Sequence, residues 1–206
     1  MTDDISKELQ ESLIQVGLKI AKRREGALFV VGDVKHTPLV EQSVNSFNVA
    51  NNPKLLESLA LMDGAVVIGK NGKMLSYGAL ILGRKRVFKN FGTRHSAALS
   101  ASRNNNLSVL VSEEDRKLRI FKNGKLIIQI DPTAKGVEKS VSDAINVLES
   151  VGAGTIGALG TSLLVPSLGI YLVPGIVVFG SVYYFGRSLH RKFSKDQTTL
   201  SKWQKK

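Results

Sequence analysis

The 206-residue sequence has no cysteine and few histidines or aromatic residues. The absence of cysteine excludes disulfide bonds, cysteine-ligated zinc and thiol catalysis. The three histidines, His36, His95 and His190, are too few and too scattered for a multi-histidine metal site. Aromatic residues make up only 6% of the chain, and no basic patch interleaved with aromatic side chains is present. We therefore expect no nucleic-acid partner.

Acidic residues are scarce, and charge is unevenly distributed. The formal net charge of +12 favours an anionic partner, such as a nucleotide or an anionic lipid. Residues 151–186 contain no charged residue, whereas residues 187–206 contain seven Lys or Arg and one Asp. The sequence therefore predicts a mixed-charge body, followed by an apolar segment and a basic tail.

The body is predicted to be an α/β domain with a mixed central β-sheet flanked by helices. Apolar residues at helical spacing predict an N-terminal amphipathic helix within residues 1–24, and the domain body spans residues 25–150. Two Asn-Gly pairs, at 71–72 and 123–124, predict β-hairpins. Apolar runs predict strands at 27–31, 65–68, 74–82, 107–111, 117–121 and 125–130. Further helices are expected at 53–61, from 96 to about 102, and at about 135–149, whereas residues 34–53 look irregular.

The first notable motif is Asp63-Gly64-Ala65, directly before the predicted strand at 65–68. A glycine and an alanine after an acid allow a ligand to approach the backbone closely. Asp-Gly is also a common turn sequence, so this motif alone indicates little.

The second motif is Gly92-Thr93-Arg94-His95, which leads into a predicted helix. A helix N-terminus favours phosphate oxygens, and the hydroxyl of Thr93 and two potential cations add directed donors. Residues 83–103 contain six Lys or Arg and no acid, which strengthens this interpretation. The alternative is a capped helix with a solvated basic face.

The third motif is Ser112-Glu113-Glu114, at the end of the predicted strand at 107–111. Carboxylates at a strand end are common surface residues. They are also the ligands that a magnesium ion bridging phosphates would need.

Together and in this order, the three motifs resemble the diadenylate cyclase family. The resemblance covers about residues 25–131 and includes the segments 26–30, 78–80, 111–114 and 123–126. It implies that the domain joins two ATP molecules into cyclic di-AMP, releases two pyrophosphates and uses Mg²⁺ or Mn²⁺. It also implies a homodimer in which each protomer binds one ATP and the two domains meet face to face.

The resemblance further implies roles for individual residues. Asp63 would activate the ribose hydroxyl or hold the metal, Glu113 would be a second metal ligand, and His95 would be catalytic. The implied nucleotide-binding residues are Gly64, Ala65, Leu80, Gly92, Thr93, Arg94, Ser112 and Glu113. Leu80 would pack on adenine, and Gly64 and Ala65 would let the ribose and base lie against the backbone.

Two residues depart from the family pattern. Ser96 stands where the family usually has a second arginine after the histidine, and Met62 stands where many members have histidine. Neighbouring Arg84, Lys85, Arg86, Lys89 or Arg103 are candidates to replace the missing guanidinium. Ser96 motivates a second hypothesis, a catalytically weakened nucleotide-sensing or scaffold protein of the same fold. The net charge leaves a third, a basic membrane-binding or nucleic-acid-binding module, although no basic patch interleaved with aromatic residues supports nucleic-acid binding.

Residues 151–186 are long enough to cross a bilayer, which takes about 20 apolar residues. A cyclase needs cytosolic ATP, and the basic tail at 187–206 favours the cytosol by the positive-inside rule. We therefore expect an apolar helical hairpin in the cell membrane, with the catalytic domain facing the cytoplasm. A single pass with the tail outside is the alternative.

Overall fold

The structure is a computed structural model that describes residues 5–83, 92–152, 164–165, 170–173 and 175–178. Its strands are β1 (Ala27–Val31), β2 (His36–Pro38), β3 (Ala65–Ile68), β4 (Met74–Ile81), β5 (Leu107–Val111), β6 (Leu118–Lys122), β7 (Lys125–Ile130), β8 (Leu164–Val165), β9 (Ile170–Val173) and β10 (Ile176–Val178). Its helices are α1 (Lys7–Lys22), α2 (Pro53–Ala60), α3 (Thr93–Ala101) and α4 (Val141–Gly152), the last preceded by a 3₁₀ turn, η1 (Val137–Ser140).

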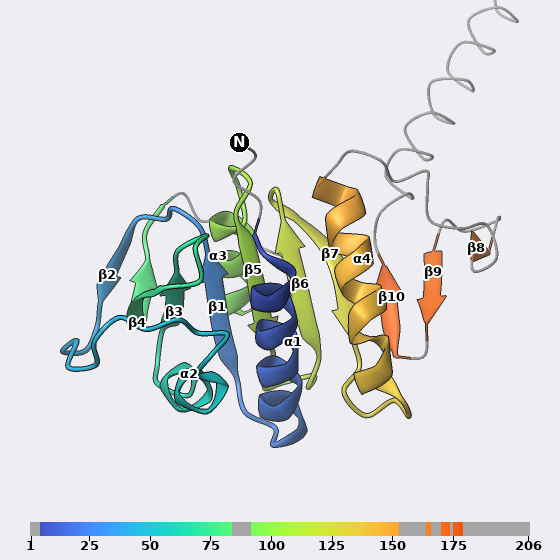
Figure 1. The fold of residues 1–206 in the computed structure, drawn as a ribbon, viewed down its shortest axis with the longest axis horizontal. Helices are drawn as coiled ribbons and strands as arrows, with labels where there is room; N and C mark the ends of the chain where they lie inside the picture. The colour runs from blue at the N-terminus through green and yellow to red at the C-terminus, as the bar shows by residue number, and fades with distance from the viewer. Residues whose placement is uncertain (1–4, 84–91, 153–163, 166–169, 174, 179–206) are drawn as a thin grey trace, which may run out of the picture.

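The strands form one mixed sheet in the order β2-β4-β3-β1-β5-β6-β7-β10-β9-β8 (Figure 1). Strand β1 lies inside the sheet, parallel to β3 and antiparallel to β5. Phe29 of β1 pairs with Val66 on one side and with Val109 on the other. All five side chains of β1 are buried, as expected for a strand that is covered on both faces. The predicted mixed sheet flanked by helices is confirmed.

Helices cover both faces of this sheet. In Figure 1, α1, α2 and α4 lie in front of the sheet and α3 lies behind it. Ser6 caps the start of α1, where its hydroxyl accepts a hydrogen bond from the backbone N–H of Leu9 at 3.3 Å. Gly17 lets α1 approach the sheet, because a Cβ atom there would lie 2.6 Å from Cδ1 of Leu118. The amphipathic helix expected at the N-terminus is thus the main cover of one face.

The predicted elements match the structure closely where apolar runs are clear. Strands β1, β3, β5 and β7 have the expected bounds. Helix α3 begins at Thr93, three residues earlier than expected, so the basic motif lies within its first turn. Strand β2 was not expected, because His36, Thr37 and Pro38 carry no apolar pattern; this edge strand is held by backbone pairing with β4.

The apolar segment 151–186 is described only in part. Helix α4 continues to Gly152, and the described residues beyond it form β8, β9 and β10 rather than helices. Strand β10 pairs with β7, where Ile176 lies opposite Ile130 and is almost fully buried. Isoleucine and valine favour strands, and Gly175, with φ of 78°, supplies the turn between β9 and β10. The expected helical hairpin is therefore not what these residues form.

The rest of that segment lies outside the described residues, as does the basic tail. The residues of the segment and tail that the structure does not describe are 153–163, 166–169, 174 and 179–206. Among the ranges that the structure describes, no helix combines the length and apolarity needed to cross a bilayer.

Candidate active site

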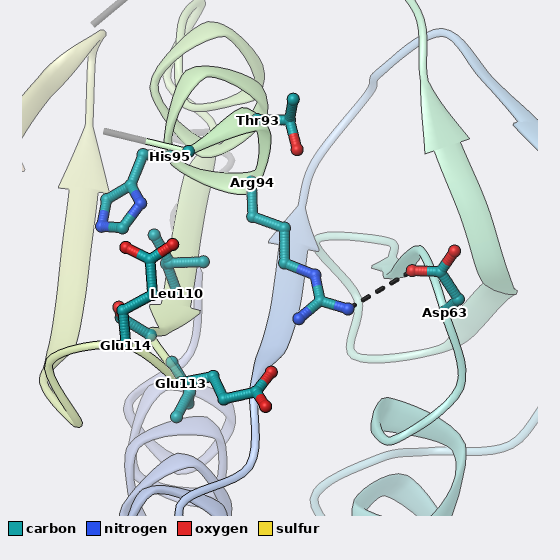
Figure 2. A pocket seen from close by; sticks show the side chains of 10 residues that line it. Asp63, Thr93, Arg94, His95, Leu110, Glu113 and Glu114 are labelled. Carbon is teal, nitrogen blue, oxygen red and sulfur yellow. Dashed lines mark hydrogen bonds and ion pairs between the residues drawn. The ribbon is translucent and has the colours of Figure 1, made fainter. Parts of the chain in front are cut away.

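Residues from all three sequence motifs line one pocket of about 310 Å³, although only Asp63 does so from the first motif (Figure 2). Asp63 comes just before β3, residues 92–95 form the start of α3, and residues 110–114 form the end of β5 and the loop after it. The topology explains why they meet. Since β3 is parallel and β5 antiparallel to β1, the start of β3 and the end of β5 both lie beside the start of β1.

The first turn of α3 forms one wall of the pocket. Gly92 is the N-cap residue and provides no side-chain hydrogen bond to the first turn. The backbone N–H groups of His95 and Ser96 donate to the carbonyl of Gly92, at 3.2 and 3.4 Å. This helix end carries partial positive charge, and the Thr93 hydroxyl stands beside it. The wall is therefore suited to phosphate oxygens.

Arg94 reaches across the pocket to Asp63. Its Nη2 atom donates to Oδ1 of Asp63 at 3.3 Å, and the side chains are 40% and 89% exposed (Figure 2). Gly26, before β1, makes room for this guanidinium, because a Cβ atom there would lie 2.5 Å from Nη1 of Arg94. The pocket thus presents an accessible cation and an accessible carboxylate side by side. An exposed pair of this kind is weak, so a phosphate can compete for Arg94.

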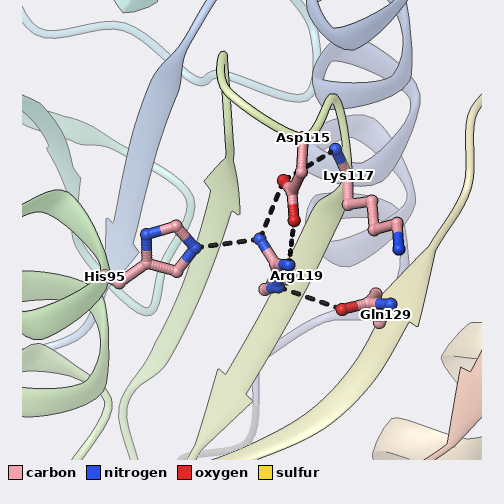
Figure 3. Close-up of polar contacts among 5 residues, drawn as sticks. All are labelled: His95, Asp115, Lys117, Arg119 and Gln129. Carbon is pink, nitrogen blue, oxygen red and sulfur yellow. Dashed lines mark hydrogen bonds and ion pairs between the residues drawn. The ribbon is translucent and has the colours of Figure 1, made fainter. Parts of the chain in front are cut away.

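His95 has a different environment from Arg94, although the two are adjacent in sequence. His95 is only 7% exposed, and Nη1 of Arg119 donates to its Nε2 at 2.9 Å (Figure 3). Burial lowers the pKa of His95 below 6.5, and the nearby Arg119 guanidinium lowers it further. We expected two potential cations in this motif. At neutral pH Arg94 is the charged member and His95 is a neutral donor and acceptor.

Asp115 and Arg119 were missed in the sequence analysis. Arg119 lies on β6 and is 4% exposed; Nη1 donates to Oδ1 of Asp115 at 3.1 Å, and Nη2 donates to Oδ2. Burial raises the pKa of Asp115, but hydrogen bonds from Arg119 and Ser112 outweigh burial and leave this pKa below its usual value. The available signal was an arginine inside the predicted strand at 117–121, where an unpaired buried guanidinium would be costly.

Ser96 is buried, and Arg103 is the only one of its proposed substitutes that the structure describes. Arg84, Lys85, Arg86 and Lys89 lie outside the described residues. Arg103 packs against the turn at Gly124, because a Cβ atom on Gly124 would lie 3.1 Å from Cγ of Arg103. Within the described part of the chain, the guanidinium that contacts His95 is that of Arg119, which comes from strand β6.

Three of the predicted nucleotide-binding residues do not line this pocket. Gly64 has φ of 106°, and a Cβ atom there would lie 2.6 Å from the backbone nitrogen of Ala79. This glycine therefore lets strand β4, rather than a ligand, approach the backbone closely. Ala65 is buried against the same strand, whereas Leu80 of β4 is 43% exposed. Leu110 and Glu114, which do line the pocket, were not predicted.

The acidic residues of the pocket are Asp63, Glu113 and Glu114. Among the described residues, no three His, Cys, Asp or Glu side chains lie close enough together to hold a metal ion by themselves. Mg²⁺ usually takes one or two carboxylates and completes its shell with water and substrate phosphates. An all-oxygen set with one or two carboxylates fits such a nucleotide-borne ion, and Asp63 and Glu113 are the residues that would hold it.

Comparisons with known proteins agree with these motifs. The family model described as "DAC: DisA bacterial checkpoint controller nucleotide-binding" matches residues 17–126. The chain is 32% identical over 149 residues to a diadenylate cyclase of Methanocaldococcus jannaschii, covering 64% of this chain and 48% of that protein. It is 35% identical over 147 residues to a diadenylate cyclase of Haloferax volcanii, covering 63% of this chain and 54% of that protein. It thus spans about half the length of these curated relatives.

A solved structure also aligns with this chain. DacA from Staphylococcus aureus matches over 66% of this chain and 95% of that chain, with 24% identity and a TM-score of 0.48.

Proposed function

This chain belongs to the DAC family of DisA-like nucleotide-binding domains, and we propose that it is a diadenylate cyclase, a nucleotidyltransferase that joins two ATP molecules into cyclic di-AMP. One observation carries this proposal. Residues from three motifs that are far apart in sequence line one pocket, which offers a cation, a carboxylate and a helix N-terminus together. These are the groups that phosphoryl-transfer chemistry needs.

The phosphates of ATP are assigned to the start of α3. There, Gly92, Thr93 and Arg94 would bind the phosphate oxygens, with Ser112 and Glu113 on the opposite wall. The ribose and adenine are assigned beside the pocket, to the backbone at Gly64 and Ala65 and to the exposed side chain of Leu80. The exposed side chain of Leu80 supports this assignment, because it offers an apolar contact to a base. His95 would act beside the phosphates as a neutral group.

In the proposed reaction, the ribose 3′-hydroxyl of each ATP attacks the α-phosphorus of the other. A bond forms between O3′ and the α-phosphorus, the bond from the α-phosphorus to the bridging oxygen breaks, and pyrophosphate leaves with that oxygen. Asp63 would accept the hydroxyl proton or help to hold a divalent metal ion with Glu113. Such an ion would neutralise charge on the phosphates. Arg94 would contribute a fixed positive charge at the same place.

The reaction requires two nucleotides, so we propose that two copies of the chain meet at their pockets. A two-fold symmetric product favours a two-fold symmetric pair of sites. The side chains of Leu61 and Met62, next to Asp63, are large, apolar and exposed in the single chain. A facing protomer would cover them. Product formation should then rise more steeply than linearly with enzyme concentration under dilute conditions.

We propose membrane attachment through residues 151–186, with the domain on the cytoplasmic side. The support is the uncharged composition and the basic tail that follows. Residues 164–165, 170–173 and 176–178 form strands of the sheet, so the contact with lipid is assigned to residues of the segment outside these strands. The full-length protein should sediment with membranes and resist release by high salt, which would remove a purely electrostatic contact. Recovery in the soluble fraction without detergent would reject this proposal.

The activity is tested by incubating the purified full-length protein with ATP and either Mg²⁺ or Mn²⁺, and by detecting cyclic di-AMP with mass spectrometry. Arg94→Gln should weaken ATP binding and lower product formation, because it removes the exposed cation of the pocket. Arg116→Gln, an equal loss of charge at an exposed residue, is the matched control. ATP binding without any product would instead favour the nucleotide-sensing alternative suggested by Ser96. Absence of ATP binding would reject both functions.

A further inference from the structure

Arg119 is a buried cation whose contacts fix its position from three directions (Figure 3). Its Nε donates to Oε1 of Gln129 on β7 at 3.0 Å, and its two terminal nitrogens donate to the carboxylate of Asp115. Its Nη1 also donates to Nε2 of His95 at 2.9 Å. The guanidinium therefore joins two strands, a loop and helix α3 at the wall of the pocket.

The chemistry of the two groups determines where the His95 proton lies. A guanidinium has only donors and is not deprotonated in proteins. The Nε2 atom of His95 must therefore be the acceptor in this hydrogen bond, and a neutral ring then carries its proton on Nδ1. A doubly protonated ring would place two N–H groups against each other. The charged groups that face His95 are Arg119 on β6, and Asp115 and Glu114 in the loop before it.

We propose that Arg119, held by Asp115 and Gln129, is a positioning residue that fixes His95 as a neutral imidazole with its proton on Nδ1. The role in catalysis rests on the proposed cyclase activity, whereas the tautomer is a property of the chain itself. Asp115 supplies the negative charge that makes a buried guanidinium tolerable. Gln129 sets the plane of the guanidinium, so that Nη1 is directed at the ring.

A purely structural role for Arg119 makes a different prediction. In that case, removal of the guanidinium would change stability without changing the tautomer of His95. If Arg119 positions the ring, its removal changes the tautomer and slows turnover, because a catalytic imidazole in the wrong tautomer cannot donate from the required nitrogen.

The test uses the full chain with ¹⁵N-labelled histidine, in which the ring nitrogen signals report the tautomer directly. Only three histidines are present, so His36→Gln and His190→Gln variants assign the His95 signals. In the wild-type protein at pH 7 we expect a protonated Nδ1 and an unprotonated Nε2. A proton on Nε2, or on both nitrogens, would overturn the proposal, whatever the activity of the protein.

Variants then connect the tautomer to turnover. Arg119→Met removes the donor at similar length and should give mixed tautomers and a kcat lower by at least about tenfold, with a smaller change in KM. Arg119→Lys retains one donor and should restore the Nδ1-protonated ring and part of kcat. Arg116→Met, an equal loss of charge at an exposed position near Arg119, should change neither. An unchanged tautomer in Arg119→Met would overturn the proposal.

Two further outcomes are informative. If Arg119→Met does not fold, Arg119→Lys alone decides, and the loss of the Nδ1 proton despite a retained donor would count against the proposal. If the wild-type protein makes no cyclic di-AMP, the proposed function fails, while the ring signals still test the positioning of His95.

Discussion

The two faces of the sheet differ greatly in what covers them. Among the residues that the structure describes, the cluster that α1, α2 and α4 form with the sheet contains 33 buried apolar residues, whereas the cluster that α3 forms with the other face contains 11. On the second face the cover is thin, because α3 contains Ala and Ser where α1 contains Leu and Ile. The larger cluster removes more apolar surface from water and therefore contributes more to stability. The other face is covered by the short helix α3, and the pocket lies at the accessible start of this helix.

The strongest test of this division is a change in the pocket that leaves the fold alone. Asp63→Asn should lower cyclic di-AMP formation by at least about 100-fold, because it removes the proposed proton acceptor or metal ligand. The unfolding midpoint should stay the same, since the side chain is exposed and its ion pair with Arg94 is weak. Asp33→Asn, at another exposed acid, is the control. Activity within about threefold of the wild type would contradict this role.

The converse test is a substitution in the larger apolar cluster, between α1 and the sheet. Leu13→Ala on α1 removes a fully buried side chain and should lower the free energy of unfolding by about 3 kcal/mol. ATP affinity and kcat of the folded protein should remain the same. Leu75→Ala, at an exposed leucine of β4, should change stability by less than about 0.5 kcal/mol. Denaturant unfolding and titration with an ATP analogue measure the two properties. A parallel loss of affinity in Leu13→Ala would mean that the two faces are not separate in function.

A substitution under α3 should affect both properties. Ala98 is fully buried between α3 and the sheet, so Ala98→Leu should cost about 1–3 kcal/mol of stability through overpacking. It should also displace the start of α3 and reduce turnover by up to about 100-fold. The measurements are denaturant unfolding and initial rates at saturating ATP. Lost stability with full activity would show that the pocket tolerates movement of this helix.

The smallest expected effect is on the pH dependence of stability. Burial lowers the pKa of folded His95 below its unfolded value of 6.5, so the unfolded chain binds more protons between these two values. The stability contributed by the neutral ring is therefore complete above about pH 6.5 and is lost as the pH falls through the folded pKa. His95→Gln should reduce the change of the urea unfolding midpoint with pH below about pH 6.5. Identical pH profiles for the two proteins would contradict the assignment.

Local sequence signals were enough to predict the centre of the sheet. Continuous apolar runs gave strands such as β1 and β5, and Asn-Gly turns with positive φ at Asn123 and Gly124 gave the β6–β7 hairpin. Residues 170–173 and 176–178, expected within a helical hairpin, form β9 and β10, because a long apolar stretch has no period that separates a buried strand from a helix.

Several individual residues of the candidate site could be identified from the sequence, but their arrangement in space could not. Asp63, Arg94 and Glu113 belong to short motifs that a reader of the sequence can identify. Their meeting depends on the pairing of β1 with both β3 and β5, which no local pattern specifies. The link from Arg119 to His95 joins a strand to a helix across 24 positions, so it becomes visible only in three dimensions.

The central position of β1 also has a consequence for how the chain folds. Phe29 of β1 pairs with Val66 and Val109, which are both far from it in the sequence. The β3–β4 and β6–β7 hairpins, in contrast, close over short loops. Short loops close before long ones, because the entropy lost on closure grows with loop length. We expect the hairpins to form early and β1 to be inserted between them in a later, slower step. The pocket, whose walls come from both sides of β1, is then complete only at the end of folding, so we expect that nucleotide does not accelerate the earlier steps.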